Sequence, residues 1–256
     1  MSISEKLQTI AENEQKVYNA GRDLGFTEGH EIGYNDAYDA AYEYGRLDGM
    51  EIGREAEYDA FWDAYTDNGT RTDWTYAFAT GWKAEIFKPN HKIKVVTGTG
   101  MFHKNNNITD FADFLGETEI DWSEAATVQY MFQNCSNLTR INVCGGGYFS
   151  YAFYASTKLH TIDRFILTDT NNYGFNEAFS HCTSLAYINE IVGTIKANVD
   201  FHYCPLVHDS LMNILNALYD YSGSGKTYTL TLGTKNLPKL TDAEKAIATQ
   251  KGWTLA

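Results

Sequence analysis

A short motif that recurs along the middle of the chain constrains its fold more than any other feature. Phe is followed by a small residue three positions later, by Leu after six and by Ile after nine. Complete copies read FQNCSNLTRI at 132–141, FYASTKLHTI at 153–162 and FSHCTSLAYI at 179–188. A fainter copy starts at Phe102, and a degenerate one contains Phe201 and Cys204. The Phe residues lie 21 to 30 positions apart, a period typical of stacked repeats that form a solenoid.

The chemistry of the motif favours a structural role for its cysteines. A unit of this size cannot bury its apolar side alone, so its residues should align with their counterparts in the next unit. Cys is a small side chain that is often fully buried, which suits a narrow interior. The copy at 153–162 has Ser156 where the other two have Cys135 and Cys182. A nucleophile or metal ligand is not expected to recur at such a position, so we interpret these residues as part of the core.

The stretches MFQNCSNLTRI and EAFSHCTSLAYI resemble the BspA-type leucine-rich repeats of bacterial surface proteins. The N-terminal EKLQTIAENEQKVYNAG and EYDAFWDAY, with the C-terminal LTDAEKAIATQKGWTLA, resemble repeat proteins encoded by phages and prophages of gut bacteria. The resemblance implies a curved leucine-rich-repeat solenoid over 94–206 that binds a surface ligand, with no catalytic residues. The uneven intervals and the glycines of CGGGYF depart from the family pattern.

The N-terminal third follows a different pattern. Gly or Ala recurs at every fourth position from Gly21 to Gly53, with acidic residues between them and no proline. This pattern predicts a helical segment over 1–65. It either packs against partner helices, which would make the chain a homo-oligomer, or is a solvated spacer helix. Turn residues and the alternating KIKVV then indicate a linker and N-terminal cap over 66–93.

The segment 207–256 has the features of a C-terminal cap. DSLMNILNALYDY has apolar residues at helical spacing, and we expect Asp209 to be the N-cap of this helix. KTYTLTLG alternates like a strand, while Thr241 and Glu244 predict a capping box for a last helix that ends at Gly252. The predicted fold class is therefore α+β: an N-terminal helical segment, an irregular leucine-rich-repeat solenoid and a helix/strand cap.

Charge and the chain's first residues restrict the classes of partner. The net charge is −13, and the sequence has no basic stripe of the kind that binds nucleic acid. We therefore expect no nucleic-acid partner. The sequence contains no apolar run of about 18 residues, so we expect no membrane insertion. The first residues do not resemble a signal peptide, so we expect reduced cysteines and a place in the host cytoplasm before lysis, then in the virion.

Several stretches resemble chemical motifs without meeting their requirements. GSGKT at 223–227 has Asp220 where a phosphate-binding loop needs Gly, and the predicted helix and strand come in the wrong order. We interpret it as a helix-to-strand turn. The spacing of His181, His202, Cys204 and His208 matches no common zinc site. The sequence therefore assigns no catalytic, cofactor-binding or metal-binding residue.

The residues that flank the buried Ile of each complete copy are candidates for ligand binding, because they should point to the open face. They are Arg140, Asn142, Thr161, Asp163, Tyr187 and Asn189. Such side chains would form a polar and aromatic platform for a glycan or a protein loop. Tyr148, Tyr151 and Tyr154 form a second, aromatic candidate patch. For each of these residues the alternative is that it is an ordinary solvated surface residue with no role in binding.

Together these features predict a non-enzymatic binding protein without a cofactor. We expect a virion-associated, tail-fibre-like module that recognises a bacterial surface glycan or protein. Two alternatives stay open, a bacterial surface adhesin at the cell surface and an intracellular interaction scaffold.

Overall fold

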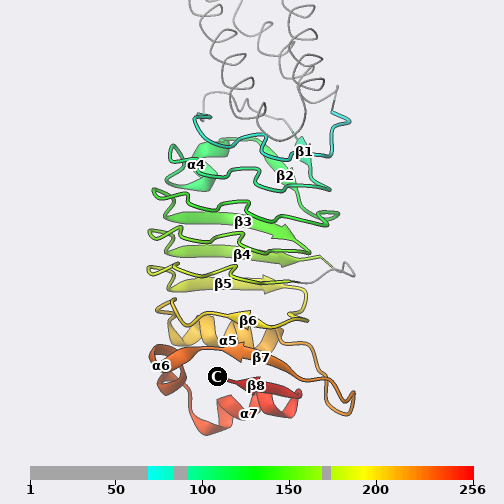
Figure 1. The fold of residues 1–256 in the computed structure, drawn as a ribbon, viewed down its shortest axis with the longest axis vertical. Coiled ribbons are helices and arrows are strands. Elements are labelled where there is room, and N and C mark those ends of the chain that lie inside the picture. Colours follow the sequence, from blue (N-terminus) through cyan, green and yellow to red (C-terminus); the bar gives the residue numbers. More distant parts are fainter. Residues whose placement is uncertain (1–68, 84–91, 169–173) are drawn as a thin grey trace, which may run out of the picture. The chain divides into compact units, whose positions relative to one another are not determined.

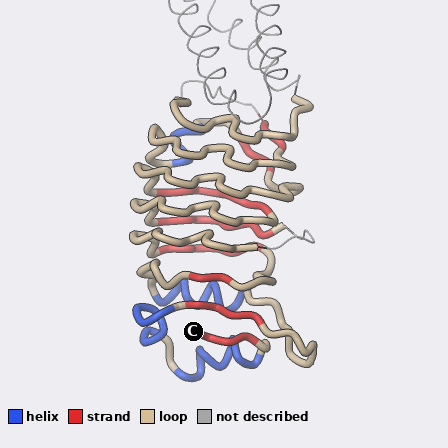
Figure 2. The backbone as a smooth tube through the Cα atoms, viewed as in Figure 1, coloured by secondary structure: helices blue, strands red, loops and turns tan. Residues whose placement is uncertain are grey.

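The computed structural model describes residues 69–83, 92–168 and 174–256 (Figures 1 and 2). The chain divides into two compact units, Met1–Arg71 and Thr72–Ala256. The predicted helical segment 1–65 lies outside the described residues. The fold described below is that of the second unit.

The strands of this unit form three small parallel sheets. The first pairs β1 (Lys92–Lys94) with β2 (Glu119–Asp121). The central sheet contains β3 (Arg140–Gly146), β4 (Thr161–Leu167) and β5 (Tyr187–Val192). The third contains β6 (Val199–Asp200), β7 (Tyr228–Thr231) and β8 (Trp253–Leu255). In Figure 1 the sheets follow one another along the long axis of the unit.

The helices of the unit are short. They are α4 (Phe111–Leu115), α5 (His208–Ala217), α6 (Gly233–Asn236), the 3₁₀ helix η2 (Leu237–Lys239) and α7 (Asp242–Gln250). Helix α4 starts where Asp110 forms a backbone bridge to Arg140, the first residue of β3. Helix α5 starts where the N–H of Val207 donates to the carbonyl of Ala186, next to β5. The two helices therefore stand at the two edges of the central sheet.

The predicted fold class, an α+β fold built on a leucine-rich-repeat solenoid, is wrong. The described chain is mixed α/β, with small parallel sheets and few helices, and contains no solenoid. The physical reason is that helices interrupt the pairing of strands. The side chain of Asp110 accepts hydrogen bonds from the N–H groups of Ala112 and Asp113, so the chain enters α4 instead of another strand. Helix α5 takes the corresponding place beyond β5, and the central sheet stops at three strands.

The recurrent motif nevertheless supplies the core, as predicted. Its Phe residues are buried and follow one another with ring centroids 4.5 to 6.0 Å apart; they are Phe102, Phe132, Phe153, Phe179 and Phe201. The four cysteines are buried and free, so the prediction that Cys135 and Cys182 belong to the core is confirmed. Burial of these rings removes a large apolar area from water.

The cysteines also make hydrogen bonds that the sequence did not reveal. The thiol of Cys135 donates to the carbonyl of Phe102 at 3.0 Å, and that of Cys182 to the carbonyl of Phe153, also at 3.0 Å. The hydroxyl of Ser156 makes the equivalent bond to Phe132 at 2.6 Å. Each small residue thus satisfies a buried carbonyl in the preceding copy of the motif, which explains why Cys and Ser exchange at this position.

The last part of the chain contains the predicted elements with one difference. The capping box of Thr241 and Glu244 is confirmed, and strand β7 lies within the predicted KTYTLTLG. The prediction that Asp209 caps α5 is wrong. The helix starts at His208, and its N-cap, Val207, makes no side-chain hydrogen bond to it. Asp209 lies instead in the first turn, with its side chain 98% exposed.

Candidate functional site

The six predicted platform residues come together on the central sheet. Arg140, Thr161 and Tyr187 are direct cross-strand partners on β3, β4 and β5. Two residues further along the same strands stand Asn142, Asp163 and Asn189. None of the six is fully buried, although the Oδ1 atom of Asn142 is, and Tyr187 is 40% exposed. The strands therefore present two rows of polar and aromatic side chains on one face.

Asp163 connects the polar groups of this face. Its Oδ2 lies 2.6 Å from Nη2 and 2.8 Å from Nε of Arg140. Its Oδ1 accepts a hydrogen bond from Nδ2 of Asn189 at 2.9 Å. The hydrogen bond and charge of Asp163, followed by the charge of Asp110, raise the pKa of the Arg140 guanidinium. These contacts hold side chains from three strands in fixed positions.

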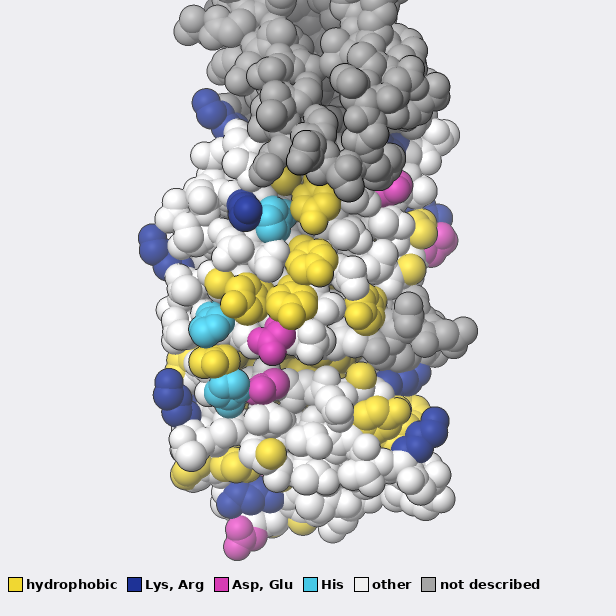
Figure 3. All heavy atoms as spheres, viewed as in Figure 1, with side chains coloured by type: hydrophobic (Ala, Val, Ile, Leu, Met, Phe, Trp, Pro, Cys, Tyr) yellow, Lys and Arg dark blue, Asp and Glu magenta, His cyan; other side chains and the backbone are white. Residues whose placement is uncertain are grey.

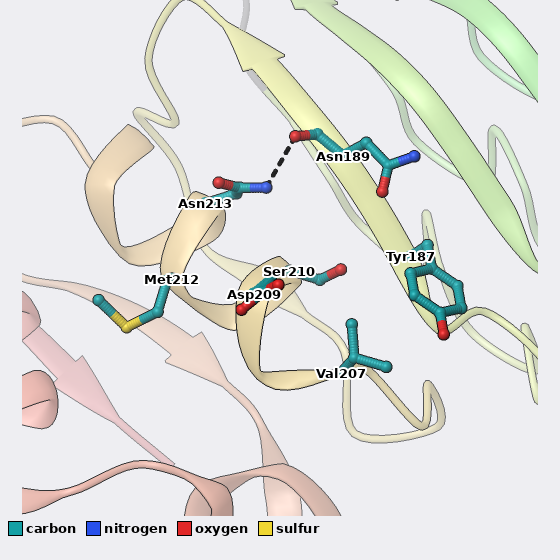
Figure 4. A pocket seen from close by; sticks show the side chains of 7 residues that line it. All are labelled: Tyr187, Asn189, Val207, Asp209, Ser210, Met212 and Asn213. Atoms are coloured by element: carbon teal, nitrogen blue, oxygen red, sulfur yellow. Dashed lines mark hydrogen bonds between the residues drawn. The ribbon is translucent and has the colours of Figure 1, made fainter.

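Tyr187 and Asn189 also line a groove between strand β5 and helix α5 (Figure 4). Its volume is about 500 Å³, and its other wall consists of Val207, Asp209, Ser210, Met212 and Asn213. A second hollow of about 290 Å³ shares Asn189 and Asn213 with the first and continues past Glu190 to Gly193 and Asn216. The first volume lies within the range of about 300–1,000 Å³ that is usual for small-molecule sites.

Side chains of α5 form hydrogen bonds to the outer edge of β5. The hydroxyl of Ser210 accepts from the N–H of Ile188 at 2.9 Å and donates to the carbonyl of Ala186 at 3.1 Å. The amide of Asn213 donates to the carbonyl of Ile188 at 3.0 Å and to that of Asn189 at 2.8 Å; the second of these bonds is drawn in Figure 4. The helix therefore occupies backbone groups that an added strand would use.

The sequence predicts 207–256 only as a cap and does not identify the α5 wall of the groove. A signal for it was present. Three polar or flexible residues follow Asp209 at helical spacing: Met212, Asn213 and Asn216 lie three, four and seven positions after it. This spacing places all four on one face of a helix. Two amides on that face beside an exposed carboxylate could have identified a polar surface.

The predicted patch of Tyr148, Tyr151 and Tyr154 is only partly formed. Tyr151 and Tyr154 are neighbours, with ring centroids 5.5 Å apart. The ring of Tyr148 instead covers Gly174, where an added Cβ would lie 2.3 Å from a ring carbon. No described ring contact joins Tyr148 to the other two. The space that this glycine leaves is therefore filled by the tyrosine ring.

Tyr151 and Tyr154 belong to a longer aromatic stripe. It consists of Tyr130, Tyr151, Tyr154, His181, Tyr203 and His202, each ring within 5.5 Å of the next. Hydrophobic and histidine side chains gather in a band on one face of the unit (Figure 3). Tyr130, Tyr151 and His181 have φ between 56° and 61°, a conformation that costs a residue with a Cβ about 1–2 kcal/mol.

The remaining chemical groups are held in structural roles. Burial raises the pKa of the thiols of Cys135 and Cys182 to about 12, which disfavours the nucleophilic thiolate. His202 pairs with Asp200 at 2.7 Å, and His208 lies between two carboxylates, Glu244 at 2.9 Å and Asp209 at 3.7 Å. In the described ranges no three His, Cys, Asp or Glu residues stand close enough to hold a metal ion.

Two further sequence features can be placed. GSGKT lies in the connection between α5 and β7, so the predicted helix-to-strand turn is confirmed, and Gly223 and Gly225 adopt positive φ there. None of the helices in the described part of the chain is both long enough and apolar enough to span a bilayer.

Comparison with known proteins gives no relative: no protein-family model, no curated protein and no solved structure matches the chain.

Proposed function

We propose that this chain is a non-enzymatic binding protein that recognises a component of the bacterial surface. The outward face of β3–β5 and the adjoining β5–α5 groove are the proposed site. The observation that carries the proposal is that Tyr187 and Asn189 belong to both, so that the platform and the groove form one continuous surface.

The fixed geometry of this surface supports the proposal. Asp163 holds Arg140 and Asn189 through its two carboxylate oxygens. Asn213 and Ser210 hold the groove wall against β5. These contacts restrain Arg140, Asn189 and the groove wall before a ligand binds, which reduces the entropic cost of binding. An exposed tyrosine beside a groove is also a common type of energetic anchor.

The second part of the proposal is that the protein is a component of a phage particle. The resemblance of the chain's ends to repeat proteins of phages and prophages supports this part, with residues 1–65 as the proposed tethering or oligomerising segment. Mass spectrometry of purified particles tests it directly. Absence of the chain from particles made by cells that express it would overturn this part and leave the binding role standing.

Binding of the labelled full chain to a panel of gut bacterial strains tests recognition. We expect the wild type to bind the surface of at least one strain, and Tyr187→Ala to bind about tenfold more weakly. Tyr219→Ala is the matched control, because Tyr219 is 42% exposed but does not line the groove. The proposal fails if the wild type binds no strain, or if the two variants lose binding equally.

A further inference from the structure

We infer that the β5–α5 groove takes a neutral or amino-bearing oligosaccharide, and neither an extended peptide nor an acidic glycan. The inference rests on the proposed function and names the class of ligand. It follows from three properties of the groove: the occupied edge of β5, the chemistry of its walls and their charge.

An extended peptide is disfavoured because the outer edge of β5 is already occupied at Ile188 and Asn189. Peptides that lie along a sheet edge bind through backbone hydrogen bonds to that edge. Here Ser210 already bonds the N–H of Ile188, and Asn213 already bonds the carbonyls of Ile188 and Asn189. At this end of the groove a ligand must therefore be recognised by side chains, and a peptide could not form the regular backbone hydrogen bonds of an added strand.

The walls offer the groups that sugars require. At one end stand the ring of Tyr187 and the methyl groups of Val207, an apolar surface for the C–H face of a sugar ring (Figure 4). Further along, Asn189 and Asn213 donate through Nδ2 to protein partners, while their Oδ1 atoms accept no hydrogen bond from any described residue. These oxygens and the exposed carboxylate of Asp209 can accept hydrogen bonds from hydroxyl groups.

The shape of the groove suits a chain of sugars. The two hollows share Asn189 and Asn213 and together follow β5 from Tyr187 to Gly193. A ligand that fills both must be elongated. The shared amides would contact it near its middle, with Tyr187 near one end.

The charge of the lining restricts the sugar further. The only charged side chains among the lining residues are Asp209 and Glu190, and Glu190 already pairs with Arg164 at 3.3 Å. No Lys, Arg or His lines either hollow. A carboxylate, sulfate or phosphate on the ligand would find no cationic partner in the lining, whereas hydroxyl, N-acetyl and ammonium groups would find acceptors.

The test uses cells of a strain that the full chain binds, treated either with periodate, which cleaves vicinal diols of sugars, or with proteinase K. We expect periodate to remove at least nine-tenths of the binding and proteinase K to leave it unchanged. The reverse result would overturn the glycan inference while the proposed function stands. If the full chain binds no strain of the panel, the proposed function is overturned and the inference with it.

An array of linear bacterial oligosaccharides, neutral, amino-bearing and acidic, tests the charge argument. The full chain should bind neutral or amino-bearing members, and Asn189→Ala should weaken that binding about tenfold relative to the control Tyr219→Ala. Asp209→Asn then separates the two accepted classes, because it weakens binding of an ammonium group more than binding of a neutral sugar. Binding only to acidic members of the array would overturn the charge argument. The same holds if the chain binds no member of the array but does bind cells in a periodate-sensitive way.

Discussion

The side-chain amide of Asn213 on α5 donates a hydrogen bond to the backbone carbonyl of Asn189 on β5, at 2.8 Å. A second bond from the same nitrogen reaches the carbonyl of Ile188 at 3.0 Å. A helix side chain thus replaces the neighbouring strand that would continue the central sheet. The same contact forms the wall of the groove, so the end of the sheet and the candidate site have one structural origin.

Removal of the Asn213 amide should therefore loosen the edge of the sheet. We expect Asn213→Ala to lower the free energy of unfolding by about 1 kcal/mol, since the partly buried carbonyl of Ile188 and the exposed carbonyl of Asn189 lose their donor. Asn216→Ala is the matched control. It lies three residues further along the same helix and has no described side-chain hydrogen bond, so its effect should stay within about 0.5 kcal/mol. Urea unfolding followed by circular dichroism measures both, and equal effects would contradict the role given to Asn213.

The small residue of the motif gives a second prediction. Ser156 donates to the buried carbonyl of Phe132 at 2.6 Å and accepts from the N–H of Cys135 at 3.2 Å. Ser156→Ala removes both bonds in the core and should cost about 1–3 kcal/mol of stability. Ser156→Cys keeps a donor at a position where Cys135 and Cys182 make the same bond, so its cost should be smaller. The urea midpoints of the two variants check this, and a Cys variant as unstable as the Ala variant would refute it.

Burial of the thiols predicts how they react. Burial raises the pKa of Cys135 and Cys182 from the ordinary 9.0 to about 12, so the folded chain keeps protons that the unfolded chain releases. Their contribution to stability is fully present below pH 9.0 and is lost as the pH rises toward 12. At pH 8 we expect no thiol of the native chain to react with Ellman's reagent within minutes, and four to react in urea. A native thiol that reacts on mixing would contradict this.

The sequence predicted the residues of the core better than it predicted the fold class. Copies of the motif align because their Phe residues stack and their small residues bond the preceding copy. Alignment of the copies also puts Arg140, Thr161 and Tyr187 side by side, which is why the platform could be predicted.

The motif could not predict the helices that end the central sheet. It shows which positions are apolar, but not whether the following residues form a strand or a helix. Phe111 occupies the position that Ile141 and Ile162 occupy in β3 and β4, yet it begins α4. The deciding residue is Asp110, whose carboxylate caps the helix and which precedes the apolar run FADFL. Local capping thus outweighed the strand pattern at that point, and the solenoid prediction failed there.

Backbone strain along the turns gives the last prediction. Ala155 has a φ of 56°, a conformation in which a Cβ crowds the following carbonyl. Ala155→Gly should therefore raise the free energy of unfolding by about 0.5–1 kcal/mol, because relief of this strain exceeds the extra entropy of glycine in the unfolded chain. Ala112→Gly removes the same methyl group from helix α4 and should lower stability by about 1 kcal/mol.

The opposite signs of these two variants separate backbone conformation from the loss of a methyl contact. Thermal unfolding of the full chain followed by circular dichroism, together with urea titration, provides the comparison. If both substitutions destabilise by the same amount, packing of the methyl group and not backbone strain decides stability at residue 155. A gain at Ala155 with a loss at Ala112 would instead show that this turn keeps a strained residue beside Tyr154 in the aromatic stripe.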